Sequence, residues 1–266
     1  MGQPSRLSRY QRLARRLVRP RVVLDAADGI HLLQHADVNA YVAVDGERLM
    51  LVDAGLPAMW SPLVRLLGEL GRTPEDLDAV VLTHGHFDHV GVARRLGGAG
   101  VPVLVHPSDQ RLAAHPYRYR SSRNRLAFPL LHPGGLPSLG RMLVCGAPVV
   151  RGVSGTRMLT SEVAAALPGS PHLVHSPGHT DGHCALHFPE RGAVLTGDAL
   201  VTLDPYTGRR GPRLVARAAT ADPGLNLASL QALAGTGADV VLPGHGDPFR
   251  GGAAEACRLA RLAGAA

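Results

Sequence analysis

Apolar residues occur along this chain in short runs of strand length, and many of these runs end in glycine or in a polar cluster. Three runs near the amino terminus (Ile30 to Leu33, Ala40 to Val44 and Leu49 to Val52) are separated by turn formers such as Asp45-Gly46, a pattern that predicts strands. Further strands are predicted at Val80 to Thr83, Val101 to Val105, Cys184 to Phe188, Ala193 to Thr196 and Asp239 to Gly244.

Between several of these runs, a longer periodicity predicts helices. Apolar residues from Trp60 to Leu70 repeat at i, i+3, i+4 and i+7, which indicates an amphipathic helix that ends near Gly71. Helices are also predicted from Val90 to Leu96 and from Ala253 to Leu262. Strands that alternate with helices are typical of an α/β fold.

Length and composition favour one large domain. The chain has 266 residues and is 45% hydrophobic, enough to bury a sizeable core, and we expect a single domain over residues 22–266. No apolar run has the 18 or more residues that a membrane span needs. The three cysteines, Cys145, Cys184 and Cys257, are widely spaced, so we expect structural thiols and no disulfide framework. Free thiols are typical of a reducing compartment, so we expect a cytoplasmic protein.

The net charge of +7 is concentrated at the amino terminus. Residues 1–21 contain seven arginines and no acidic residue, which leaves 21 basic against 21 acidic residues in the rest of the chain. We therefore treat residues 1–21 as a basic extension and expect no nucleic-acid partner. Arg6 to Arg19 has the pattern of a basic amphipathic helix, which either packs on the protein or lies on an anionic membrane surface without stable insertion.

The segment His84-Gly85-His86-Phe87-Asp88-His89 places three histidines and one aspartate in six residues, directly after a predicted strand. Imidazole and carboxylate groups are the ligand set that suits zinc, iron or manganese. Ligand sites of α/β sheets lie at the carboxyl ends of strands, where this segment begins. The pattern favours a metal site over a polar surface loop.

Other candidate ligands follow later strands, each beside a glycine. They are His179 in Gly178-His179-Thr180, Asp198 in Gly197-Asp198 and His245 in Gly244-His245. Asp53 also ends a predicted strand, where it either caps the next helix or orients a metal-binding histidine. We favour the second role, because this strand is expected beside the one that ends at Thr83. His106 is assigned a packing role and no metal.

Residues 107–171 are predicted as an insertion between the ligand segments, either a lid or a solvated helical hairpin. Within it, Arg118 and Arg120 are candidates for binding a carboxylate or phosphate of the substrate, because guanidinium groups bind such anions with two parallel hydrogen bonds. Tyr206 and Arg209 are candidates on the opposite rim.

The order of these candidate residues along the chain resembles the motifs of the metallo-β-lactamase superfamily. The residues that carry the resemblance are Asp53, His84 to His89, Gly178-His179, Gly197-Asp198 and Gly244-His245. The resemblance spans residues 53–245 and implies a four-layer αββα sandwich with metal ions at one edge. It implies one metal ion on His84, His86 and His179, and a second on Asp88, His89 and His245. Asp198 would bridge the two ions, and Asp53 and His183 would orient the ligands through hydrogen bonds.

The same resemblance implies a metal-dependent hydrolase. Two divalent ions, expected to be Zn2+ with iron or manganese as alternatives, would share a hydroxide that attacks the substrate, with Asp88 and Asp198 as catalytic residues. The motifs are similar to those of glyoxalase II-like thioesterases and lactonases, so a small thioester, lactone or other ester is the expected substrate. Because only 21 residues follow His245, a glutathione thioester is not favoured.

Two other activities remain open from the sequence. The family's mononuclear iron dioxygenases, which act on persulfides, share these ligand residues with its hydrolases. Nucleic-acid processing hydrolases also belong to the family, although only the basic residues 1–21 support that activity here. The expected partner is a small-molecule substrate, either neutral or anionic, and a homodimer is left open.

Overall fold

The computed structural model describes residues 17–124 and 128–266. Its largest sheet has seven strands in chain order: β1 (Arg21–Ala27), β2 (Ile30–His35), β3 (Val38–Asp45), β4 (Arg48–Val52), β5 (Ala79–Val81), β6 (Val103–Val105) and β7 (Arg157–Met158). Strands β1 to β4 are antiparallel neighbours, whereas β4 to β7 run parallel. Most of the predicted amphipathic helix after β4, residues 60–70, is α2 (Trp60–Glu69).

A second sheet lies against the first. Its strand order is β13 (Val240–Pro243), β10 (Ala193–Gly197), β9 (Cys184–Phe188) and β8 (His172–His175). Strands β10 and β13 are parallel, and the other neighbours are antiparallel. A small two-stranded sheet of β11 (Val201–Leu203) and β12 (Arg210–Arg213) follows β10.

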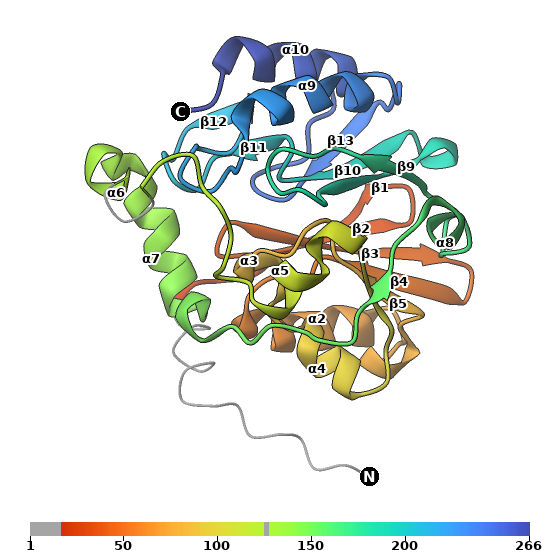
Figure 1. The fold of residues 1–266 in the computed structure, drawn as a ribbon. Coiled ribbons are helices and arrows are strands. Elements are labelled where there is room, and N and C mark those ends of the chain that lie inside the picture. Colours follow the sequence, from red (N-terminus) through yellow and green to blue (C-terminus); the bar gives the residue numbers. More distant parts are fainter. Residues whose placement is uncertain (1–16, 125–127) are drawn as a thin grey trace.

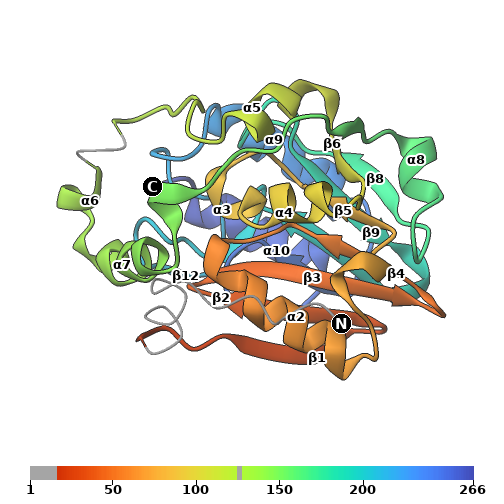
Figure 2. The same ribbon diagram turned by 90° about the horizontal axis from the view of Figure 1, so that it is seen from below.

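Helices cover the outer face of each large sheet (Figure 1). Helices α2 and α4 (Ala93–Gly98) lie below the seven-stranded sheet, and α9 (Pro223–Ala234) and α10 (Ala253–Ala263) lie above the four-stranded sheet. The remaining helices are α3 (Phe87–Val90), α5 (Gln110–Ala114), α6 (Phe128–Leu131), α7 (Leu136–Val144) and α8 (Ser161–Ala165). Figure 2 shows α6 and α7 together at one side of the molecule.

Three separate apolar cores hold the four layers together. Alternate side chains of β10 face opposite ways: Leu195 packs between the two sheets, and Val194 packs toward α9 and α10. On the other side, Leu63 and Leu67 of α2 pack against the outer face of the seven-stranded sheet. This arrangement of layers confirms the predicted αββα sandwich.

The predicted helix from Val90 to Leu96 is interrupted. Helix α3 ends at Val90 and α4 begins at Ala93. The amide of Gly91 donates to the carbonyl of Gly55 (2.7 Å), and the amide of Val92 donates to Ala54 (3.0 Å), so neither bonds within a helix. These tertiary hydrogen bonds fasten the residues after the histidine cluster to the loop that follows β4.

The segment 107–171 does more than connect the two halves. Its strand β7 extends the seven-stranded sheet, and Asp109, near the start of the segment, is buried.

The three cysteines are buried free thiols, as expected, and burial raises the pKa of Cys145 and Cys184 to about 12. In the described part of the chain, no helix is long and apolar enough to cross a membrane. The predicted helix Arg6 to Arg19 lies mostly outside the described residues.

Candidate metal centre

Two pairs of parallel strands bring the candidate ligands to one edge of the sandwich. Val52 at the end of β4 pairs with Val81 at the end of β5, which confirms that Asp53 and the histidine cluster follow neighbouring strands. In the other sheet, β10 and β13 end side by side and deliver Asp198 and His245. Parallel strands have their carboxyl ends at the same edge, so local spacing in the sequence becomes proximity in the fold.

The structure gathers all seven predicted metal ligands into one buried cluster. Each of the seven residues is at most 6% exposed: His84, His86, Asp88, His89, His179, Asp198 and His245. Three overlapping groups of these residues have ligand atoms within 4.8 Å of one another: His84, His86 and His179; His84, His89 and Asp198; Asp88, His89 and His245. The first and third groups are the two predicted sets.

Four of the five imidazoles in the cluster have Nδ1 within hydrogen-bonding distance of a group that is not one of the seven candidate ligands. The ring of His89 contacts the Asp53 carboxylate (2.8 Å), and that of His245 contacts the backbone carbonyl of Asp37 (2.8 Å). Because both partners only accept hydrogen bonds, Nδ1 of each ring donates, and in the neutral ring Nε2 carries the lone pair. Nδ1 of His84 lies 3.0 Å from the Thr83 hydroxyl, and Nδ1 of His179 lies 3.3 Å from that of Thr220. All four Nε2 atoms therefore face the cluster.

Asp198 lies at the centre of these nitrogens. Its Oδ2 is 3.3 Å from Nε2 of His245, 3.5 Å from Nε2 of His179 and 4.0 Å from Nε2 of His84. Its Oδ1 is 3.4 Å from Nε2 of His89. A single carboxylate thus touches ligand atoms from both predicted sets.

Several of these inward-facing atoms have no hydrogen-bond partner among the described residues, although they are buried. They are Nε2 of His84, Nε2 of His89 and Oδ1 of Asp198. His86 faces the cluster through Nδ1, which lies 3.0 Å from Nε2 of His179. A buried polar group without a partner costs about 1 to 3 kcal/mol, so three in one place would destabilise the fold if nothing bound them. Divalent cations would satisfy these three atoms, and the donor set suits them.

The protonation states of His86, His179 and Asp198 suit metal binding. Burial lowers the pKa of His86 to about 4 and that of His179 well below its usual value, so both imidazoles are neutral near pH 7. At Asp198, burial would raise the pKa, but neighbouring His245 and His89 outweigh it and hold the carboxyl pKa well below its usual value. Neutral imidazole and ionised carboxylate are the forms that coordinate metals. Burial would lower the pKa of His245 and His89, but Asp198 outweighs it and raises the pKa of His245 to about 10 and that of His89 well above its usual value, so a cation that binds there would displace a proton from each ring.

Two glycines permit the close approach of the ligand loops. Gly178 has a φ of +124°, and a Cβ there would lie 2.1 Å from the backbone nitrogen of Asn226. A Cβ at Gly244 would lie 2.2 Å from Oδ1 of Asp198, inside the cluster. Glycine is therefore required before both His179 and His245.

Asp53 and His183 contact the cluster in different ways. Asp53 has a φ of +60°, in the left-handed region, and its carboxylate accepts from His89 and from the amide of Thr83 (2.8 Å). His183 accepts through Nε2 from the amides of Asp198 (3.0 Å) and Ala199 (3.2 Å). Asp53 thus orients an imidazole directly, whereas His183 positions the backbone that carries Asp198.

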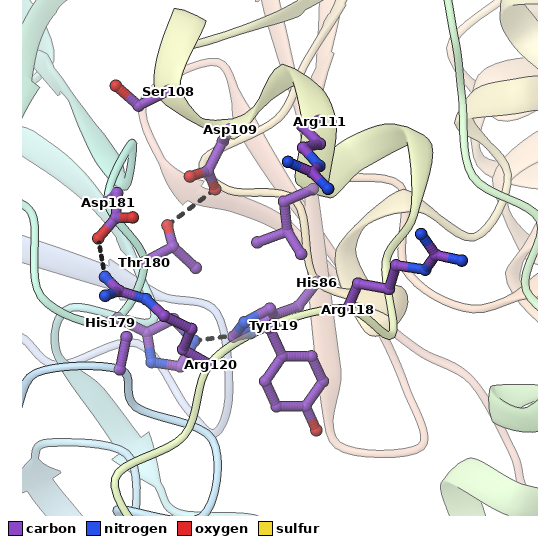
Figure 3. A pocket seen from close by; sticks show the side chains of 12 residues that line it. His86, Ser108, Asp109, Arg111, Arg118, Tyr119, Arg120, His179, Thr180 and Asp181 are labelled. Atoms are coloured by element: carbon purple, nitrogen blue, oxygen red, sulfur yellow. Dashed lines mark hydrogen bonds and ion pairs between the residues drawn. The ribbon is translucent and has the colours of Figure 1, made fainter.

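Of the predicted substrate-binding residues, Arg118 and Arg120 line a pocket beside His86 and His179 (Figure 3). Tyr206 and Arg209 are not among the residues that line this pocket. Burial raises the pKa of Tyr206 well above its usual value, and the Tyr206 hydroxyl forms a hydrogen bond with Tyr119. The ring of Tyr119 in turn packs against His86, with 4.4 Å between the ring centroids. Arg209 is exposed in the connection between β11 and β12. Substrate binding by Tyr206 or Arg209 stays a prediction.

Asp109 is a site residue that the sequence did not identify. Its carboxylate accepts from the amide of Gly85 (2.9 Å), the hydroxyl of Thr180 (2.8 Å) and the amide of Gly182 (2.8 Å). It therefore ties the loop of His84 and His86 to the loop of His179. The only local signal is an acidic residue soon after a predicted strand, which also fits a helix cap.

We expect Asp109→Asn to lower ester hydrolysis by about 10- to 100-fold, the range typical of residues that orient metal ligands. An asparagine amide presents a donor where the wild-type oxygen accepts, so the two loops would separate. The exposed Asp28→Asn serves as the control. Metal affinity and kcat should fall in Asp109→Asn alone; a variant that is less stable to heat but has unchanged metal affinity would contradict the positioning role.

The αββα sandwich and the buried histidine and aspartate cluster at its edge define a class of metal-dependent hydrolases. The chain belongs to the metallo-beta-lactamase superfamily, whose family model matches residues 35–245. The resemblance seen in the sequence is thereby confirmed.

Relatives cover most of the chain. "Probable metallo-hydrolase YflN" of Bacillus subtilis is 25% identical over 246 residues, 88% of this chain and 90% of the relative. The crystal structure of a metallo-beta-lactamase family protein from Thermus thermophilus, TTHA1429, is 25% identical, with a TM-score of 0.62 over 92% of this chain and 78% of that one. TTHA1623 in a di-iron-bound form is 27% identical, with a TM-score of 0.58 over 87% of this chain and 93% of that one.

Proposed function

We propose that the protein is a dinuclear metal-dependent hydrolase of a small thioester, lactone or other ester. The observation that carries this proposal is the position of Asp198, whose carboxylate lies within 4.0 Å of imidazole nitrogens from both ligand sets. A carboxylate in that position suits a bridge between two cations. The names of relatives such as the probable metallo-hydrolase YflN support hydrolysis as the reaction type.

The proposed ligand sets follow the grouping of the side chains. One cation would be held by His84, His86 and His179, and the other by Asp88, His89 and His245, with Asp198 shared. When bound, two such cations supply Lewis acidity and a water molecule whose pKa falls from about 15.7 toward 7.

The chain's own residues would orient the reacting groups. The carboxylate of Asp88 lies 3.5 Å from Nε2 of His245, and its side chain is only 9% exposed, so it can accept a proton from a nucleophilic water at the cluster. Asp53 fixes the ring of His89, and His183 fixes the backbone of Asp198. These contacts hold the site in one geometry before substrate arrives.

Zinc is the proposed metal, with iron and manganese as alternatives. Five imidazoles and two carboxylates suit all three ions. The similarity to TTHA1623, solved in a di-iron-bound form, supports iron as an alternative metal.

Metal content and oxygen uptake test the proposal together. We expect the protein, purified without added metal, to contain close to two zinc or manganese ions per chain and to hydrolyse small thioesters or lactones without consuming oxygen. Metal would be measured by mass spectrometry, and oxygen uptake with a persulfide substrate. One iron ion per chain with oxygen uptake would replace the hydrolase by a dioxygenase on the same scaffold.

A further inference from the structure

A pocket opens beside the metal cluster, with His86 and His179 in its wall. Its volume is about 180 Å³, below the roughly 300 to 1,000 Å³ that is typical of sites for drug-sized ligands. It is formed mainly by α5, the loop after it and the loop around Thr180. The space suits one end of a small substrate next to the cluster.

The charged residues of this pocket are three arginines and two aspartates. Figure 3 shows the guanidinium groups of Arg111, Arg118 and Arg120 on different sides of the two imidazoles in this view. Only one of the three is compensated: Arg120 donates to the carboxylate of Asp181 at 2.6 Å, in an exposed ion pair. The pocket therefore has an excess of positive charge.

The second aspartate, Asp109, forms no ion pair with the remaining arginines. Both carboxylate oxygens of Asp109 accept from the backbone of Gly85 and Gly182 and from the hydroxyl of Thr180. Within residues 17–124 and 128–266, the side chains of Arg111 and Arg118 make no hydrogen bond or ion pair. Two exposed arginines of this pocket thus have unused guanidinium donors.

From this arrangement we propose that Arg111 and Arg118 form a subsite for the anionic group of the substrate, a carboxylate or a phosphate. The inference rests on the proposed hydrolase and names its substrate class: a small ester or thioester with an oxyanion at one end. Guanidinium groups bind such oxyanions through paired, charge-assisted hydrogen bonds. Arg111 is new in this role, and Arg120 makes a smaller contribution because Asp181 already neutralises it.

Matched thioesters test the subsite. One pair is the acetyl thioesters of 3-mercaptopropionate and 3-mercaptopropanamide, which places the charge on the thiol side. The other is the adipyl and adipamoyl thioesters of a neutral thiol, which places it on the acyl side. The acetyl thioester of 2-mercaptoethyl phosphate distinguishes phosphate from carboxylate. Each is measured with the metal-loaded wild type and with Arg111→Gln, Arg118→Gln, the double variant and Arg120→Gln.

We expect a charged member to have at least about a tenfold higher kcat/KM than its neutral partner in the wild type, with the phosphate arm showing which oxyanion is preferred. Arg111→Gln and Arg118→Gln should each reduce that preference, and the double variant should abolish it, because kcat/KM should fall far more for the charged thioesters than for their neutral partners. Arg120→Gln should change it less. No preference in either pair, or a preference that survives in the double variant, overturns the subsite.

A binding measurement separates failure of the subsite from failure of the proposed function. If no neutral thioester is hydrolysed, the hydrolase proposal fails, but adipate binding to the metal-loaded protein can still be followed by calorimetry against adipamide. Loss of adipate binding in the double variant supports the subsite. Equal adipate binding in the wild type and the double variant overturns it, because the anion would then contact the metal ions alone.

Discussion

Asp198→Ala is expected to lower ester hydrolysis by at least about 1,000-fold, or about 4 kcal/mol in activation free energy, and to leave fewer than two metal ions per chain. The carboxylate is the group that lies closest to both ligand sets, 3.3 Å from Nε2 of His245 and 3.5 Å from Nε2 of His179. Without it, two neighbouring cations would lose both a shared ligand and a negative charge that offsets their repulsion.

Asp198→Asn is the matched variant, since it keeps the shape of the side chain but removes the charge. Circular dichroism of both variants would show whether the fold persists, and mass spectrometry would give the metal content. We expect folded protein with depleted metal in each case. Full activity with two metal ions in Asp198→Ala would contradict the bridging role.

The sequence predicts which side chains gather at the candidate metal centre, because the order of the strands in the two sheets brings these side chains together. Asp53, His84, Asp198 and His245 each follow a strand closely, and β4, β5, β10 and β13 form two parallel pairs. A residue just beyond a parallel strand has its position fixed within a few ångström by the sheet itself. Short-range sequence patterns are therefore enough to locate such residues.

Residues positioned by long-range loop contacts are not predictable in the same way. The partners of Asp109 are 24, 71 and 73 residues away in the sequence, and nothing near Asp109 distinguishes it from a helix cap. The interrupted helix at Gly91 has a similar origin, because its amide bonds to Gly55 across the fold. In both places tertiary hydrogen bonds determine the structure, and the neighbouring residues in the sequence do not indicate these bonds.

The charge of the pocket beside the cluster is only partly predictable from the sequence for a related reason. The arginine-rich segment indicated anion binding, yet it could not show which guanidinium groups remain uncompensated. That depends on Asp181, which lies 61 residues after Arg120 and neutralises it. In the proposed function, specificity would thus depend on pairing between loops, whereas the reaction type would depend on residues at strand ends.

His84→Ala is expected to abolish measurable hydrolysis, by at least about 1,000-fold, and to remove bound metal. His84 is fully buried, and its Nε2 belongs to two of the three ligand groups, so its loss affects both proposed cation positions. His106→Ala is the control, because His106 stacks on His175 at 4.6 Å and belongs to none of the three groups. Metal content and ester hydrolysis should be unchanged in His106→Ala. Equal losses in the two variants would mean that general damage to the fold, and not removal of a ligand, explains the effect at His84.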